Sequence, residues 1–372
     1  MRFIPIVLIL AGILGGNLYV FYRLWHLMPY SLIGRFLFIV IACILISSPF
    51  ISMGLGGHLP TGITSFLYKI GTSWLILFMY LLLFFLFCDL IRVTHLFPIE
   101  KFMYANGSGL GVILICACLL LGSGYYRYLH KDRVELTLPL NKTMTTQGEL
   151  KIVAISDLHL GYSIGKEEFK GWVDLINQEN PDLVLIAGDI TDNNIKPLYE
   201  QDMAAVFKEI KSKYGTYAIL GNHEYIADPV NASAFLESAG VTLLRDSVAC
   251  VDHRFYIIGR DDRSNSQRKT MEALTASLDP SLPILLLDHQ PYHLEEAEKY
   301  KIDFQFSGHT HNGQVWPINW VTQALFEKAH GYLKKGDSHF YISSGLGIWG
   351  GKFRIGTRSE YVVVTIKGNT PS

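Results

Sequence analysis

The distribution of charge along the chain most constrains what it can fold into. Only eight of the 65 Lys, Arg, Asp and Glu residues lie within the first 124 positions, and the other 57 lie beyond Gly124. A segment with so few charges suits a lipid environment, whereas the rest has the composition of a water-soluble domain. We therefore expect a membrane part followed by a soluble part.

Four apolar stretches of the first part are long enough to cross a bilayer, which takes roughly 20 helical residues. They are Phe3–Tyr22, Leu32–Met53, Ile70–Ile91 and Gly109–Tyr125. A cleaved signal peptide is the alternative for the first stretch, but no small-x-small site precedes a hydrophilic mature start, and another apolar run follows. We predict a transmembrane helical region of about four helices over residues 1–126, in a multi-pass protein of the cell membrane.

The basic residues flanking these stretches bear on orientation. With four crossings, the N-terminus and the soluble part share one side of the membrane. That side collects Arg2, Lys69, Arg127, Lys131 and Arg133, and the other side collects Arg23, Arg35, Arg92 and Lys101. The positive-inside rule therefore favours a cytoplasmic soluble domain.

Two further segments follow the membrane region. Residues 127–148 are polar, mixed in charge and without a long apolar period, so we predict a linker there. Over residues 149–372, short β-rich apolar runs alternate with amphipathic segments such as Phe169–Ile176, in which the apolar residues recur at helical spacing. Alternation of this kind predicts an α/β domain.

Five apolar runs of this domain end in side chains that can bind metal. The residues that follow the runs are Asp157 and His159, then Asp189, then Asn222 and His223, then His289, and last His309 and His311. In α/β sheets the carboxyl ends of parallel strands meet at one edge, where ligands bind. We expect these residues, although far apart in sequence, to lie together there.

Each motif has an ordinary structural explanation when taken alone. Asp-x-His and Gly-Asp are common turn sequences, Gly-Asn-His-Glu can cap a helix, and His289 can be a hydrogen-bonded core residue. The ordered set of five, each at a strand end, favours a site. Its donors are nitrogen and oxygen without thiolate, a set that suits Mn, Fe or Zn.

With these motifs, the chain resembles the calcineurin-like metallophosphoesterase superfamily, over roughly Glu149 to Lys367, and most closely its bacterial membrane-associated phosphodiesterase branch. The resemblance implies a β-sandwich flanked by helices, with a dinuclear metal site at one edge. It implies that Asp157, His159 and His311 hold one divalent ion, that Asn222, His289 and His309 hold the other, and that Asp189 bridges both. His223 matches the catalytic histidine of the family.

We therefore predict a membrane-anchored phosphohydrolase. Two divalent ions, Mn²⁺, Fe²⁺ or Zn²⁺, would supply a metal-bridging hydroxide that attacks a phosphate ester or anhydride in line. The anchor suggests a phosphodiesterase or pyrophosphatase acting on a lipid-linked or nucleotide-type substrate. The net charge of -1 argues against long nucleic acid as a partner. The alternative is a membrane sensor or scaffold that uses the domain only to bind a ligand.

Overall fold

The structure, a computed structural model, describes residues 3–95, 97–99, 102, 107–143 and 149–369. The chain divides into two compact units, an N-terminal unit of Met1–Tyr125 and a C-terminal unit of Tyr126–Ser372. Each unit has its own hydrophobic core, and the two are described separately.

The N-terminal unit is helical, as expected. Its elements are α1 (Phe3–Leu27), α2 (Leu32–Gly54), η1 (Gly56–His58), α3 (Thr61–Thr94) and α5 (Gly107–Leu129), of which α5 continues into the C-terminal unit. Among the described residues, α2, α3 and α5 are long and apolar enough to cross a membrane, one fewer than the four predicted. The remaining stretch falls on α1, and the side chains of its residues 3–9 lie outside those described.

Polar groups inside this apolar unit are paired. Arg23 on α1 donates a hydrogen bond to the Asp89 carboxylate on α3, and Tyr19 donates to the same carboxylate. The Trp74 indole donates to Asn17 Oδ1 at 2.9 Å. Pairing of this kind offsets the cost of placing polar groups where water is scarce.

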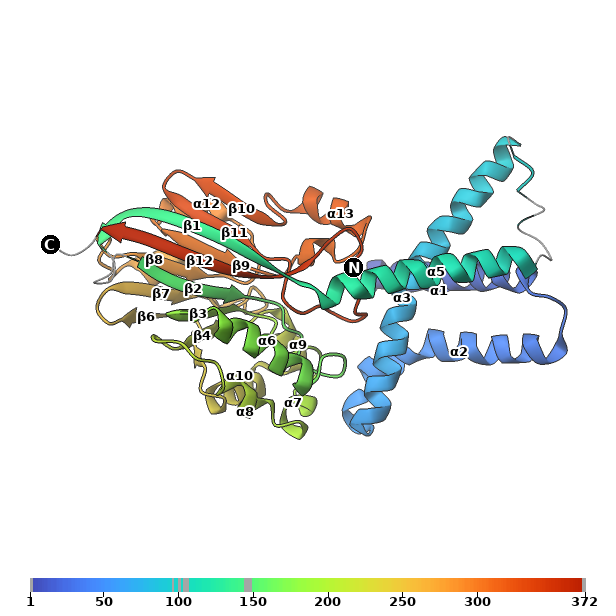
Figure 1. The fold of residues 1–372 in the computed structure, drawn as a ribbon, viewed down its shortest axis with the longest axis horizontal. Helices are drawn as coiled ribbons and strands as arrows, with labels where there is room; N and C mark the ends of the chain where they lie inside the picture. Colours follow the sequence, from blue (N-terminus) through green and yellow to red (C-terminus); the bar gives the residue numbers. More distant parts are fainter. Residues whose placement is uncertain (1–2, 96, 100–101, 103–106, 144–148, 370–372) are drawn as a thin grey trace. The chain divides into compact units, whose positions relative to one another are not determined.

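The C-terminal unit is built on two six-stranded sheets (Figure 1). The first has the order β1-β12-β2-β3-β4-β5, and the second has the order β10-β11-β9-β8-β7-β6. Strands β2 to β5 are mutually parallel, and so are β7, β8, β9 and β11. The strands are β1 (Lys131–Thr143), β2 (Glu149–Ile155), β3 (Leu183–Ala187), β4 (Thr216–Ile219), β5 (Thr242–Leu243), β6 (Ser247–Val251), β7 (Phe255–Gly259), β8 (Ile284–Leu287), β9 (Phe304–Ser307), β10 (Gly331–Lys335), β11 (Ser338–Ile342) and β12 (Ser359–Asn369).

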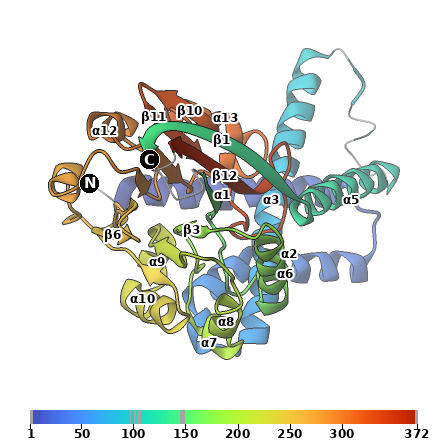
Figure 2. The ribbon, with the colours of Figure 1, turned by 60° about the vertical axis from the view of Figure 1, so that its left-hand side comes forward.

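Helices cover both outer faces of this sandwich (Figures 1 and 2). Residues of α6, α8 and α10 pack on the first sheet, and residues of α11 and α12 pack on the second. The helices are α6 (Lys166–Gln178), α7 (Lys196–Glu200), α8 (Met203–Phe207), α9 (Asn222–Ala227), α10 (Pro229–Ser238), α11 (Met271–Thr275), α12 (Leu294–Lys299), η2 (His311–Gly313) and α13 (Ile318–Leu325). The α/β prediction and the flanked β-sandwich are confirmed.

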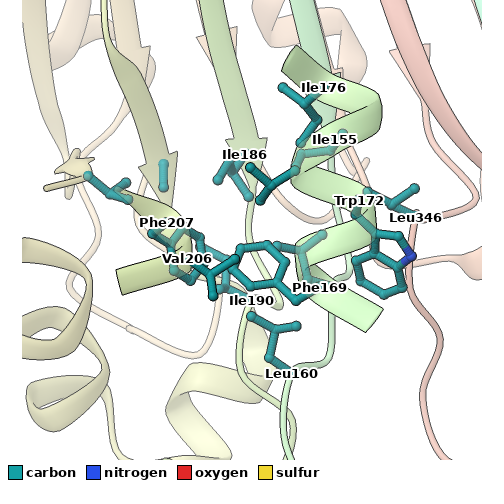
Figure 3. Packing of buried hydrophobic residues seen from close by; sticks show 14 of the residues in the cluster. Ile155, Leu160, Phe169, Trp172, Ile176, Ile186, Ile190, Val206, Phe207 and Leu346 are labelled. Atoms are coloured by element: carbon teal, nitrogen blue, oxygen red, sulfur yellow. The ribbon is translucent and has the colours of Figure 1, made fainter. Parts of the chain in front are cut away.

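The sequence pattern explains the layers. Along β2, Leu150, Ile152 and Ala154 face the other sheet, whereas Val153 and Ile155 face the helices, so this strand is apolar on both sides. On the helix side, Phe169, Trp172 and Ile176 of α6 pack with Ile155 and Ile186 of the sheet (Figure 3). Burial on two faces fixes the position of each strand end, and the strand ends carry the site.

The segment predicted as a linker contains a strand instead. Lys131–Thr143 forms β1, which pairs in parallel with β12 from Lys131↔Ser359 to Pro139↔Lys367. The signal is an alternation of period two, in which Val134, Leu136, Leu138 and Leu140 contribute to the core between the sheets. A search for long apolar runs does not detect it. Residues 144–148, the rest of the predicted linker, lie outside the described residues.

Candidate metal centre

All eight residues singled out from the sequence lie at one edge of the sandwich. Strands β2, β3 and β4 of the first sheet and β8 and β9 of the second end there, and each is followed directly by one or two of these residues. The carboxyl ends of parallel strands from both sheets therefore supply the site together. These residues are Asp157, His159, Asp189, Asn222, His223, His289, His309 and His311.

One group of donors comprises Asp157, His159, Asp189 and His311, whose ligand atoms lie within 4.8 Å of one another. The Nε2 atoms of His159 and His311 are 3.0 Å apart. Nε2 of His311 is 3.4 Å from Asp157 Oδ1, and Nε2 of His159 is 3.8 Å from Asp189 Oδ2. Two imidazole nitrogens and two carboxylates thus converge on one point, as a bound cation requires.

A second group comprises Asp189, His289 and His309, again within 4.8 Å. Nε2 of His289 lies 3.2 Å from Asp189 Oδ2 and 3.2 Å from Asn222 Oδ1. The Asn222 oxygen is also 2.8 Å from Nδ1 of His309. Asp189 belongs to both groups, so one carboxylate lies between two potential cation positions.

A backbone hydrogen bond on the side of the ring away from Asp189 fixes the tautomer of His289. Its Nδ1 lies 2.7 Å from the Ala187 carbonyl oxygen, to which it donates a hydrogen bond. Nε2 is then the nitrogen that faces Asp189. Such outer hydrogen bonds orient the ring of a metal-binding histidine and increase its basicity.

The backbone is held in unusual conformations here. Asp157, His159, Asp189, His309 and His311 all have φ between 46° and 71°, in the left-handed region that non-glycine residues rarely adopt. Each such residue costs on the order of 1–3 kcal/mol, and strain of this kind is concentrated at functional sites. The fold therefore maintains this geometry against its local preference.

Two glycines let the backbone approach the carboxylates. A Cβ on Gly221 would lie 2.2 Å from Asp189 Oδ1, and a Cβ on Gly308 would lie 2.3 Å from Asp157 Oδ2. Both distances are far below a normal contact, so any larger residue would displace the carboxylate. These glycines directly precede Asn222 and His309. Their role is therefore to position the donor groups.

The buried ionisable groups of the centre differ in the direction in which their pKa values are shifted. Burial raises the pKa of Asp189, but the neighbouring His289 outweighs this effect by charge and by hydrogen bonding, with His223 and His159 adding to it, and the pKa falls well below its usual range. Burial and the charge of His289 lower the pKa of His309 to about 4. Burial, with His159 and Arg354 nearby, holds the pKa of His311 well below its usual range. An ionised Asp189 and neutral His309 and His311 are in the forms that bind metals. The pKa of His289, in contrast, is raised well above its usual range, because the charges of Asp189 and Asp157 outweigh its burial.

His223 differs from the other histidines. Its Nδ1 lies 3.5 Å from Asp192 Oδ1, its ring packs edge-on against His159 with centroids 4.5 Å apart, and its side chain is partly exposed. Burial opposes protonation, but the close contact with the Asp192 carboxylate and the charges of Asp189 and Asp192 prevail and raise the pKa to about 9. His223 therefore carries a proton at neutral pH beside the two donor groups.

Sequence reasoning did not find Asp192 or assign a role to Glu224. Asp192 is buried between His159 and His223, and its signal is the second Asp of Asp189-Ile-Thr-Asp192. The buried Glu224 carboxylate accepts hydrogen bonds from the backbone N–H groups of Asp189, Thr191 and Gly221. Glu224 thereby joins the loops that follow β3 and β4. The sequence feature that could have revealed it is its position directly after His223.

The arginines near the C-terminus have different environments. Arg354 is fully buried and donates to the carbonyl oxygens of His311, Ser344 and Gly347, so it braces the loop that carries His311. Arg358 is partly exposed and pairs with Glu360 and Asp132. The burial of Arg354 and its three bonds to carbonyl oxygens make its role structural.

Together, the Asp and His cluster indicates a divalent metal site. The donor set and its convergence fit a divalent cation.

Comparison with known proteins agrees with this geometry. The calcineurin-like phosphoesterase family matches residues 150–313. An uncharacterized metallophosphoesterase of Aquifex aeolicus is 30% identical over 67% of this chain and 97% of its own length. An uncharacterized metallophosphoesterase of Helicobacter pylori is 31% identical over 64% of both chains.

A transmembrane protein with metallophosphoesterase domain from Danio rerio is 30% identical over 63% of this chain. The match spans 64% of the length of the Helicobacter pylori protein and 57% of that of the Danio rerio protein. The similarity thus extends to a relative described as a transmembrane protein. On these grounds the chain belongs to the calcineurin-like phosphoesterase family, whose members are phosphoester hydrolases.

Proposed function

We propose that the protein is a membrane-anchored, metal-dependent phosphohydrolase with a dinuclear centre. The observation that carries this proposal is the position of Asp189, whose carboxylate belongs to both donor groups. Asp157, His159 and His311 would complete one ion site, and Asn222, His289 and His309 the other. Two divalent ions held there would activate a water as nucleophile and withdraw charge from the phosphoryl oxygens.

The chain's own residues supply the rest. The Asn222 carboxamide contributes an oxygen without charge, so the site adds less negative charge next to an anionic phosphate. His223, protonated and held by Asp192, would donate its proton to the leaving oxygen, a contribution typically of 10²–10⁴-fold. Glu224 and Arg354 keep the loops rigid, so that proton donor and donor groups stay in register.

The substrate class follows from the anchor. A chain with several helices of membrane-spanning length keeps its phosphoesterase domain near a bilayer, and we propose a lipid-linked or nucleotide-type phosphodiester or pyrophosphate as substrate. The flanking basic residues support a cytoplasmic location of this domain and a multi-pass anchor. The net charge of -1 provides no basic footprint for long nucleic acid.

The test uses the full chain in lipid nanodiscs, stripped of metal and then supplied with Mn²⁺, Fe²⁺ or Zn²⁺. We expect about two ions per chain and metal-dependent hydrolysis of a chromogenic phosphodiester, compared with the matching monoester. Asp189→Ala should abolish both metal binding and turnover. Two bound ions without turnover on any phosphoester, including lipid-linked ones, would overturn the proposal and favour a sensor or scaffold that only binds its ligand.

A further inference from the structure

A second feature lies beside the metal centre and is not needed for hydrolysis. Helix α13 follows the loop that carries His309 and His311, and each of its eight residues is at least partly exposed. Large apolar side chains gather on it and just before it. Their exposed fractions are 42% for Trp316, 39% for Ile318, 61% for Trp320, 52% for Val321 and 68% for Leu325.

This segment lacks charged residues, although the chain beyond Gly124 is otherwise rich in them. No Lys, Arg, Asp or Glu stands between His311 and Glu327, although 57 of the 65 such residues lie beyond Gly124. Water-exposed helices normally carry charged residues on the outer face. A short apolar helix with Trp residues is typical of a segment that lies in the interface of a bilayer.

The helix is firmly attached to the metal centre at both ends. At its start, a Cβ on Gly313 would lie 2.4 Å from the Asn319 nitrogen, so the loop and the helix are in close contact. At its end, the Phe326 ring lies 6.1 Å from the His309 ring and 4.8 Å from the Tyr292 ring. The Trp316 backbone N–H donates to the Ile355 carbonyl at 2.7 Å. A surface bound by α13 would therefore lie next to the loop that carries His309 and His311.

The last turn of α5 lies within the C-terminal unit, in the same region as this segment. Its last residues, Tyr126–Leu129, belong to the C-terminal unit, where Tyr128 is fully buried in the core and Arg127 pairs with Asp132. Arg127 lines a groove of about 480 Å³ together with Asn312 and His330. Asn312 and His330 also line the adjoining hollow beside Gln323 of α13. Within this unit, α13 lies at the end where β1 begins (Figure 1).

We propose that the α13 surface, formed by Trp316, Ile318, Trp320, Val321 and Leu325, docks on the lipid bilayer that the chain's own helices span. The occupant is a lipid surface because a bilayer is already the partner of α5, whose end reaches the same groove, and because the helix presents Trp and aliphatic side chains without charge. Docking holds the loop of His309 and His311 against the membrane. It gives the centre access to esters that stay in the bilayer, and it goes beyond the proposed hydrolysis.

The first test measures contact between α13 and lipid and does not depend on enzymatic activity. The full chain is placed in nanodiscs whose lipids carry bromine on the acyl chains near the headgroup, a quencher of tryptophan fluorescence. Its emission is compared with that of the Trp316→Phe/Trp320→Phe variant, and the difference isolates two of the six tryptophans. We expect brominated lipid to quench that difference by more than half relative to ordinary lipid. Equal difference spectra in both lipids would overturn the proposal, because α13 would then not be in contact with the acyl chains.

The second test separates docking from catalysis. Trp320→Ser/Leu325→Ser should lower turnover of a phosphoester embedded in the nanodisc at least tenfold and leave turnover of a water-soluble ester unchanged. Ile226→Ser/Val230→Ser is the matched control, since its side chains are 61% and 72% exposed on α9 and α10, and it should change neither rate. An equal loss on both substrates, or none on the embedded one, would contradict the proposal. The quenching result stands even if hydrolysis itself is not found.

Discussion

Asp192 Oδ1 lies 3.5 Å from Nδ1 of His223, and Nδ1 of His159 lies 3.6 Å from the same oxygen. One buried carboxylate therefore contacts both the proposed proton donor and a proposed metal ligand. Its own pKa is lowered, because its contacts with the two imidazoles outweigh the effect of burial, so it is ionised at neutral pH. This pairing distinguishes His223 from His309 and His311, whose pKa values are lowered.

Asp192→Asn should therefore change the pH profile. The carboxylate raises the pKa of His223, so the acid form persists to higher pH and is lost as pH rises through that pKa. Removal of the charge lowers the pKa, and the alkaline limb of kcat should move to lower pH, with kcat reduced roughly 10- to 100-fold. The pH dependence of kcat for wild type and variant measures this. His223→Ala should have no alkaline limb of this origin, and an unchanged limb in Asp192→Asn would contradict the pairing.

Gly221→Ala should damage the metal centre. The new Cβ would lie 2.2 Å from Asp189 Oδ1 and 2.6 Å from the Asp189 backbone nitrogen, so the carboxylate shared by both donor groups and the backbone that carries it must move. We expect metal affinity to fall roughly tenfold or more, measured by titration of the metal-free chain. Gly171→Ala on α6 is the control, since its Cβ meets nothing within 4 Å, and it should stabilise the fold by about 0.5–1 kcal/mol. Equal metal affinities in the two variants would count against this role.

Lys142→Met should destabilise the C-terminal unit. Lys142 Nζ lies at the end of β1 and donates at 2.6 Å to Asp303 Oδ2, which also accepts from the Ile284 backbone N–H. Burial raises the pKa of Asp303, and Lys142 opposes that rise, so the variant leaves a buried carboxyl without its cation. We expect the free energy of unfolding to fall by roughly 2–3 kcal/mol. This is less than for a fully buried ion pair, because both groups are partly exposed. Lys367→Met removes the exposed pair with Glu149 and should cost less than about 0.5 kcal/mol in the same thermal unfolding assay.

Arg354→Met should loosen the loop of His311. The variant leaves the buried carbonyl oxygens of His311, Ser344 and Gly347 without their donor, which should cost roughly 3 kcal/mol. The melting temperature of the metal-free chain measures the loss. Arg254→Met, which removes only a surface pair with Asp252, should leave that temperature within a degree or two. Similar melting temperatures for the two variants would show that Arg354 does not brace the loop.

The strand ends were predictable because both faces of the parallel strands are buried. Long apolar runs therefore mark these strands, and the metal-binding side chains directly after each run are easy to recognise. Ile152–Ile155 before Asp157 and Leu183–Ala187 before Asp189 are examples. The edge strand β1 was not predictable in the same way, because only its alternate residues Leu138 and Leu140 are buried. Asp192 escaped for a different reason: its role depends on two rings that approach from other strands, a relation that spacing along the chain does not encode.

The junction of α5 and β1 has a consequence for how the enzyme meets its substrate. A single residue, His130, separates the end of the helix at Leu129 from the start of the strand at Lys131. No linker longer than this residue separates the helix from the first strand of the domain. For the bilayer-embedded phosphoester proposed above, turnover should scale with its surface density in the bilayer rather than with its bulk concentration.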